Sequence, residues 1–133
     1  MISTAGEIHN ASVKYDSIAM SAIYFEKSAT IPIQFNLANY SSSTELGEAI
    51  TKNINAEGLK HILVFSDGQK VNGSKLVEGI NKHLSNDVIV TGGLAGDGVN
   101  FNETLVSLNG ANNSGNVVAI GFYGESLEVG SGS

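Results

Sequence analysis

The chain has 133 residues, enough for one domain with a sizeable core, and its 41% hydrophobic and 15% charged residues are typical of a folded protein. Seven basic and thirteen acidic residues give a formal net charge of −6, which argues against nucleic acid as a partner. The absence of cysteine excludes disulfides and thiol catalysis. Because no apolar run approaches the roughly 20 residues that span a bilayer, and the start does not resemble a signal peptide, we expect a cytoplasmic protein with no membrane partner.

Two strands are predicted in the first third of the chain. Residues 16–25 are rich in β-forming side chains and mostly apolar on both faces, which is typical of a central strand. Residues 31–38 alternate between apolar and polar side chains, as in a strand with one wet face, and residues 26–30 suit a hairpin loop between the two. Pro32 cannot donate a ladder hydrogen bond, so it places this second strand at a sheet edge or at its own start.

A first helix is predicted after Ser42. Ser42 and Glu45 have the spacing of a capping box, in which each end of the motif satisfies a free backbone N–H group. Leu46, Ile50 and Ile54 then recur every four residues, which predicts one buried stripe along the helix.

A strand, helix and strand follow. Gly58 indicates the end of the first helix, and residues 61–65 are a short apolar run of the strand type. Asn72 is a suitable N-cap for a second helix, which carries apolar residues at positions 76, 80 and 84. A strand over residues 88–91 completes a βαβ crossover, which should be right-handed with its two strands parallel.

The last third is predicted to be a β-meander. Residues 103–108 and 116–123 are strand-like, and the turn-forming residues 109–115 suit a hairpin between them. Residues 126–129 could form a last, returning piece. The whole pattern predicts a single α/β domain over residues 1–133, with a mixed β-sheet, two helices, one βαβ crossover and a C-terminal β-meander.

The glycine-rich segment 92–98 is the first candidate ligand site. Gly92, Gly93 and Gly96 follow a predicted strand and could aim backbone N–H groups at an anion such as an α-carboxylate, while Asp97 could hold an ammonium group. An amino acid would satisfy both. The alternative is that the glycines only permit a tight turn or close strand packing, with Asp97 capping its own loop. The segment has neither the Gly-Lys-Ser/Thr ending of a P-loop nor the following helix of a dinucleotide fingerprint.

Residues near the start provide further candidates. Ser3, Thr4 and Glu7 supply two hydroxyls and a carboxylate around one glycine, and we expect Thr4 and Glu7 to face the same cavity as the glycine-rich segment. The alternative is that this segment is frayed and Glu7 is simply solvated.

A hydrolase would need a serine, a base and an acid close together. Ser66 and Asp67 could contribute with one of the three histidines at positions 9, 61 and 83, but the Gly-x-Ser-x-Gly elbow is absent and Asp67-Gly68 reads as a turn. The three histidines are scattered, with no metal-ligand spacing, so we expect no metal site.

Three motifs in order resemble the FIST N-terminal domain: residues 3–7 (Ser-Thr-Ala-Gly-Glu), 91–97 (Thr-Gly-Gly-Leu-Ala-Gly-Asp) and 118–124 (Val-Ala-Ile-Gly-Phe-Tyr-Gly). A run like residues 64–67 followed by a helix lies between the first two, as in that family. The resemblance covers most of the chain. It also implies that the chain is a fragment, because the strand and helix that normally precede the first motif and the Gly-Trp segment after the last strand are missing.

The resemblance implies a function. FIST domains are sensory modules of prokaryotic signalling proteins, so we expect a non-enzymatic, cytoplasmic, bacterial domain, of the kind used in two-component signalling, that binds a small amino-acid-like ligand and passes the signal to a companion output domain. No cofactor is expected. Some similar proteins bind haem and sense nitric oxide, which leaves haem, with a histidine as axial ligand, as an alternative. A hydrolase or transferase using the same pocket is a further alternative. Unpaired sheet edges also predict a homodimer.

Overall fold

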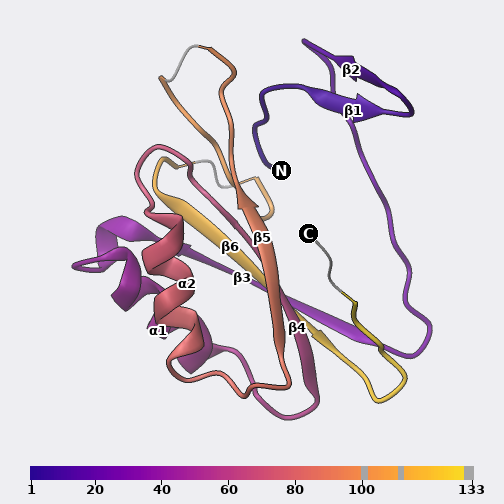
Figure 1. Cartoon of the computed structure of the whole chain (residues 1–133), viewed down its shortest axis with the longest axis vertical. Helices are drawn as coiled ribbons and strands as arrows, with labels where there is room; N and C mark the ends of the chain where they lie inside the picture. Colours follow the sequence, from indigo (N-terminus) through magenta and orange to yellow (C-terminus); the bar gives the residue numbers. More distant parts are fainter. Residues whose placement is uncertain (100–101, 111–112, 131–133) are drawn as a thin grey trace.

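The computed structural model describes residues 1–99, 102–110 and 113–130. Within them the main sheet has four strands in the order β3-β6-β4-β5 (Figure 1). The strands are β3 (Ala29–Asn36), β4 (Leu59–Ser66), β5 (Ile89–Leu94) and β6 (Asn116–Tyr123). β6 is antiparallel to both β3 and β4, whereas β4 and β5 are parallel, so the sheet is mixed.

A separate hairpin stands near the start of the chain. It consists of β1 (Glu7–His9) and β2 (Ser12–Lys14), which pair antiparallel with each other and, in the described residues, with no strand of the main sheet. Figure 1 shows this hairpin beyond one end of the sheet, joined to β3 by a long extended segment.

Both helices begin where their caps predict. α1 (Ser43–Asn53) starts at Ser42, whose side chain accepts from the Glu45 N–H group, while the Glu45 carboxylate accepts from the Ser41 N–H group. α2 (Gly73–Asn81) starts at Asn72, whose side chain accepts from the Lys75 N–H group. A short 3-10 helix, η1 (Leu37–Asn39), links β3 to α1.

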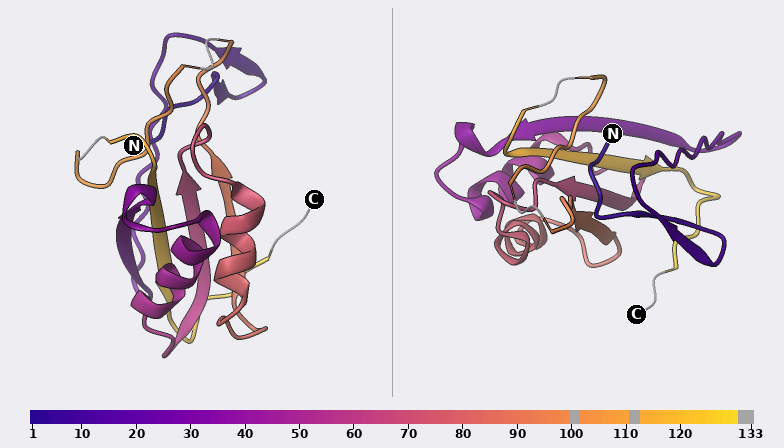
Figure 2. Two further views of the ribbon diagram at one scale, coloured as in Figure 1. Left: turned by 90° about the vertical axis from the view of Figure 1, so that its left-hand side faces the viewer. Right: turned by 90° about the horizontal axis from the view of Figure 1, so that it is seen from above.

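The two helices lie side by side on one face of the sheet (Figure 2). They bury the main core, in which alternate residues of the strands meet the apolar stripes of the helices. Two glycines make the close helix approach possible, because a Cβ at Gly47 would lie 2.2 Å from the Leu76 carbonyl oxygen and one at Gly79 would lie 2.1 Å from that of Thr44. The fully buried members of this core are Leu46, Ile50, Ile62, Ile80, Val117 and Ala119.

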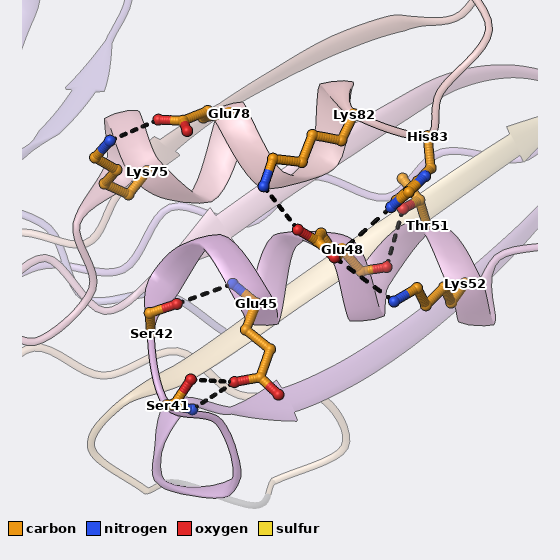
Figure 3. Close-up of polar contacts among 10 residues, drawn as sticks. All are labelled: Ser41, Ser42, Glu45, Glu48, Thr51, Lys52, Lys75, Glu78, Lys82 and His83. Atoms are coloured by element: carbon orange, nitrogen blue, oxygen red, sulfur yellow. Dashed lines mark hydrogen bonds and ion pairs between the residues drawn. The ribbon is translucent and has the colours of Figure 1, made fainter.

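Charged groups also bridge the helices on their outer surface (Figure 3). Glu48 on α1 lies 2.8 Å from the Lys82 ammonium at the end of α2, and 3.6 Å from His83. Hydrogen bonding and charge attraction from Lys82 lower the pKa of Glu48, so the carboxylate stays ionised and pairs with the Lys82 ammonium.

The opposite face of the sheet has only a small cover. Val118 packs there with Ala95 and Val106, and with the half-buried Ile2 and Phe65. Ile2 and Val106 form an isolated antiparallel bridge, which ties the first residues of the chain to the segment before β6.

Much of the predicted architecture is confirmed. The chain forms an α/β fold with two helices and a mixed sheet, and β4-α2-β5 is a βαβ unit with parallel strands. Pro32 lies in β3, which is an edge strand as its missing N–H group requires. Gly58, which was expected to end the first helix, instead takes a φ of 71° in the turn before β4.

Two expectations about strands were wrong, and a third strand is present with different bounds. Residues 16–25 form no strand, because no neighbour pairs with them. Among the described residues, 103–108 contribute only the bridge at Val106, so these residues do not build the C-terminal meander and β6 instead inserts between β3 and β4. The strand expected over residues 88–91 is β5, which continues to Leu94 and therefore includes residues 92–94 of the glycine-rich segment. Residues 111–112 of the expected hairpin lie outside the described residues.

None of the helices in the described ranges combines the length and the apolar character needed to cross a bilayer.

Candidate functional site

An open hollow of about 760 Å³ lies between the N-terminal hairpin and the loop that follows β5. We call it the N-terminal hollow. Three carboxylates line it: Glu7 from β1, Asp16 after β2, and Asp97 after β5. Its other lining residues are Thr4, Ala5, Gly6, Tyr15, Ser17, Ile18, Gly98 and Val99. The lining is therefore negatively charged and mixed in character, with hydroxyls from threonine, serine and tyrosine beside apolar side chains such as Ile18 and Val99.

The Glu7 carboxylate is held in place by two hydroxyls. Thr4 Oγ1 donates to Glu7 Oε1 at 2.7 Å, and Ser17 Oγ donates to Glu7 Oε2 at 2.8 Å. These hydrogen bonds, Thr4 first, lower the pKa of Glu7 and keep it ionised at neutral pH. Glu7 is thus a fixed negative charge in the wall of the hollow.

Asp97 shapes the loop on the other side of the hollow. Its Oδ2 atom accepts from the backbone N–H groups of Asn102 and Glu103, at 3.0 and 3.1 Å. This is the loop-capping role that the sequence offered as an alternative. The capped carboxylate still lines the hollow, so the loop geometry fixes a second negative charge opposite Glu7.

Ser3 and Gly96 join the two walls beneath the hollow. The Ser3 N–H group donates to the Leu105 carbonyl at 2.8 Å, and the Leu105 N–H group donates to Ser3 Oγ at 2.9 Å. Gly96 donates its N–H to the Ser3 carbonyl at 3.0 Å, and a Cβ at Gly96 would lie 3.0 Å from the Ala5 nitrogen. The structure thus brings the first and second sequence motifs together through backbone contacts.

Gly92 and Gly93 lie elsewhere. Both belong to β5, and a Cβ at Gly92 would lie 1.9 Å from the Val64 carbonyl oxygen of the neighbouring strand. They line a second, mostly apolar groove of about 190 Å³ between β5 and α2. Of the glycine-rich segment, only the part from Asp97 onward shares a cavity with Thr4 and Glu7. Gly92 serves close strand packing, which was the alternative reading of these glycines.

Asp67 is the centre of a network that sequence reasoning missed. Its side chain is fully buried at the end of β4, where Oδ1 accepts from the N–H groups of Gln69 and Lys70 and from the Thr104 hydroxyl, at 2.7, 3.0 and 2.7 Å. Its Oδ2 accepts from Ser114 Oγ at 3.1 Å and from the Gly115 N–H group at 2.6 Å.

Burial alone raises the pKa of Asp67, but the hydrogen bonds from Gly115, Lys70, Thr104 and Gln69 outweigh it and hold the pKa at about 2. The Asp-Gly turn after a buried strand was visible in the sequence. The donors from residues 104, 114 and 115 were not, because they come from the other side of the glycine-rich segment.

The residues considered for a hydrolase do not meet. Ser66 is 1% exposed, and the neighbouring Asp67 carboxylate is occupied by its five donors. His61, at the other end of β4, has its Nε2 atom 2.8 Å from Thr91 Oγ1, and burial lowers the pKa of this histidine. His83 pairs with Glu48 on the helix surface.

Haem does not fit the linings of the three hollows described in this structure. A haem site needs a cavity with an axial ligand such as histidine in its wall. A third hollow is an amide-rich depression beside β3 that includes Gln34 and Asn36. The linings of this hollow, the apolar groove and the N-terminal hollow contain no histidine. Across the described ranges, no group of three or more histidine, aspartate or glutamate side chains could hold a metal ion.

Comparison with known proteins gives one match. The family model of the FIST N domain matches residues 2–133, which is nearly the whole chain. No curated protein and no solved structure matches. The match includes both walls of the N-terminal hollow and the joint between them. The chain therefore belongs to the FIST N domain family, a family of sensory domains of signal transduction proteins.

Proposed function

We propose that the protein is a non-enzymatic, intracellular sensory domain that binds a small amino-acid-like ligand in the N-terminal hollow and passes the signal to a companion output domain. Membership of a sensory family supports the general role. The ligand class rests on one observation: Glu7 and Asp97, from segments about 90 residues apart in the chain, line the same open hollow. Its volume of about 760 Å³ is in the usual range for small-molecule sites.

The charges of the hollow favour a ligand with an ammonium group. Glu7 is ionised and oriented by Thr4 and Ser17, so an ammonium group that approaches it meets an acceptor already in place. Asp16 and Asp97 add negative charge to the same lining. The Tyr15 hydroxyl offers a donor to the polar remainder of the ligand, and the Ser17 oxygen, whose proton is donated to Glu7, can still accept.

The proposed signal is a shift in population between two arrangements of the hairpin. β1 and β2 pair only with each other in the described residues, and the backbone contacts that fix the first residues to the body come from residues 1–3, before the hairpin begins. A ligand held between Glu7 and Asp97 would favour the arrangement in which the two walls are close. A ligand can shift this equilibrium only by its difference in affinity for the two states, so contact with both walls is required.

A thermal-shift screen of the twenty amino acids, followed by calorimetry on those that stabilise the protein, tests the proposal. We expect at least one of them to bind, and its N-acetyl derivative, which lacks the ammonium group, to bind at least tenfold more weakly. Glu7→Gln keeps the size of the side chain but removes the charge, and we expect it to weaken binding by about tenfold or more, as for a lost hydrogen bond to a charged group.

Two matched variants serve as controls. Glu57→Gln removes a carboxylate from an exposed turn that does not line the hollow, and Gly93→Val changes the outer edge of β5, where a Cβ would meet nothing within 4 Å. Both should bind the amino acid as the unaltered protein does. The proposal is wrong if no amino acid binds, or if folded Glu7→Gln binds as tightly as the two controls.

A further inference from the structure

The segment between the hairpin and β3 exposes large apolar side chains. We call residues 17–25 the arm. The exposed fractions are 95% for Ile18, 91% for Met20, 74% for Ile23 and 87% for Tyr24. Figure 1 shows the arm as an extended chain that runs from β2 to the start of β3. Apolar residues exposed in one continuous run mark an interaction surface rather than an ordinary loop.

The arm has the composition of a β-strand, but no other strand of the described structure pairs with it. It contains no charged residue, glycine or proline, and Ile18, Met20, Ala22 and Tyr24 alternate with their neighbours as on one face of a strand. None of its residues is in a strand pairing of the described structure. An extended, uncharged, β-forming segment with free backbone groups readily adds to the edge of another sheet.

The β5 edge of the main sheet is suited to receive such a strand. Within the described residues β5 pairs with β4 only, so its other side has unpaired backbone groups. Residues 88–96 include no charged residue and no proline, the side chains that usually protect an edge. Beside this edge lies the apolar groove of about 190 Å³, where Leu94 is 53% exposed and Val77 on α2 is 44% exposed.

The opposite edge is less suited. It is formed by β3, whose Pro32 lacks the N–H group that an added strand would need. The residues that lead into β3 also include the charged pair Glu26 and Lys27. The two edges therefore differ in a way that selects β5.

The C-terminal end of the arm packs against β6, away from the β5 edge of the same molecule. The Phe25 ring packs edge-on against Phe122 of β6, with ring centroids 5.9 Å apart. β6 is separated from β5 by β4, a displacement of about 10 Å at the usual strand spacing. To reach its own β5 edge the arm would have to give up this ring contact. Ser17, at its other end, is hydrogen-bonded to Glu7, whereas the apolar side chains between these two ends are exposed to another molecule.

We propose that the arm of one copy adds as a strand to the β5 edge of a second copy of this chain. The arm of the second copy adds to the β5 edge of the first in the same way, which gives a two-fold symmetric dimer. The main-chain groups of the arm and of β5 satisfy each other, and apolar arm side chains enter the groove beside Leu94 and Val77. This inference does not depend on the proposed ligand.

Sedimentation of the purified chain over a wide range of concentration tests the proposal. We expect a concentration-dependent dimer with twice the 13.8 kDa mass of the chain. Met20→Lys places a charge on the arm and Val77→Lys places one beside the groove, and each should weaken the dimer on the order of 100-fold because a charge would be buried without a partner. Ala56→Lys, on an exposed turn, is the matched control and should leave the dimer unchanged. Circular dichroism confirms that each variant is folded.

Cysteine pairing then identifies the two surfaces, since the chain has no cysteine of its own. One chain carries a single cysteine at position 18, 20, 22 or 24 of the arm, and the other carries Gly93→Cys, a position where a side chain meets nothing within 4 Å. At least one mixture should form a disulfide-linked pair, and no mixture of the same arm variants with Ala56→Cys should do so. A chain that carries both an arm cysteine and Gly93→Cys tests for pairing within one copy. The proposal is overturned by a strictly monomeric protein, by a dimer that the two lysine substitutions leave intact, or by a disulfide that forms within a monomer of this double variant.

Discussion

Replacing Asp67 with asparagine should strongly destabilise the fold, because no other side chain of similar shape can accept from the same five donors. The two carboxylate oxygens are fully buried and take hydrogen bonds from both sides of the site. In Asp67→Asn one oxygen becomes an NH₂ group, which then faces donors instead of accepting from them. Losing charged hydrogen bonds and leaving buried N–H or O–H groups without a partner should reduce the free energy of unfolding by about 3–5 kcal/mol.

The charge of Asp67 also gives this prediction a pH signature. Its pKa falls from an ordinary value of 3.8 to about 2 in the folded state, which corresponds to about 2 kcal/mol of stability. Because the folded pKa is the lower one, this contribution is fully present above pH 3.8 and is lost as the pH falls through 2. The asparagine side chain does not titrate, so the variant should lack this part of the acid sensitivity.

Urea unfolding at pH 7 and at a series of values down to pH 2 measures both effects. Asp87→Asn, on the exposed turn before β5, is the control and should remain within about 0.5 kcal/mol of the unaltered protein at pH 7. If Asp67→Asn were as stable as this control, or lost stability in acid as steeply as the unaltered protein, the account of Asp67 as a charged centre of the fold would be refuted.

Two further changes test the local packing. Gly92→Ala should lower the free energy of unfolding by more than about 2 kcal/mol in thermal or urea denaturation, because the new Cβ would lie 1.9 Å from the Val64 carbonyl oxygen. Gly93→Ala is the control and should cost less than about 1 kcal/mol, because a Cβ there meets nothing within 4 Å. Equal costs would show that β4 and β5 do not approach this closely. Asn72→Ala removes the acceptor for the Lys75 N–H group and should lower the free energy of unfolding by about 1 kcal/mol in the same assay. The control, Ser74→Ala at an exposed position of α2, should change it little. If Asn72→Ala left the stability unchanged, α2 would not depend on this cap.

The sequence by itself determined the features that arise from residues close together in the chain. Ser42 and Asn72 each place a hydrogen-bond acceptor three residues before a free helical N–H group, so both helix starts could be read directly. The four-residue recurrence of Leu46 and Ile50 then showed the buried side of α1. The order of strand, helix and strand from β4 to β5 required parallel pairing, which the structure confirms. The three short motifs were enough to suggest the family.

Only the tertiary structure decided which strand-like segments find a partner. Residues 16–25 and 103–108 have the composition of strands, but a strand also needs a neighbour, and pairing depends on segments far away in the chain. For the same reason the sequence could not separate Gly92, packed against Val64, from Asp97, which lines the N-terminal hollow. The donors that gather on Asp67 come from residues up to 48 positions away, and only folding brings them to one carboxylate.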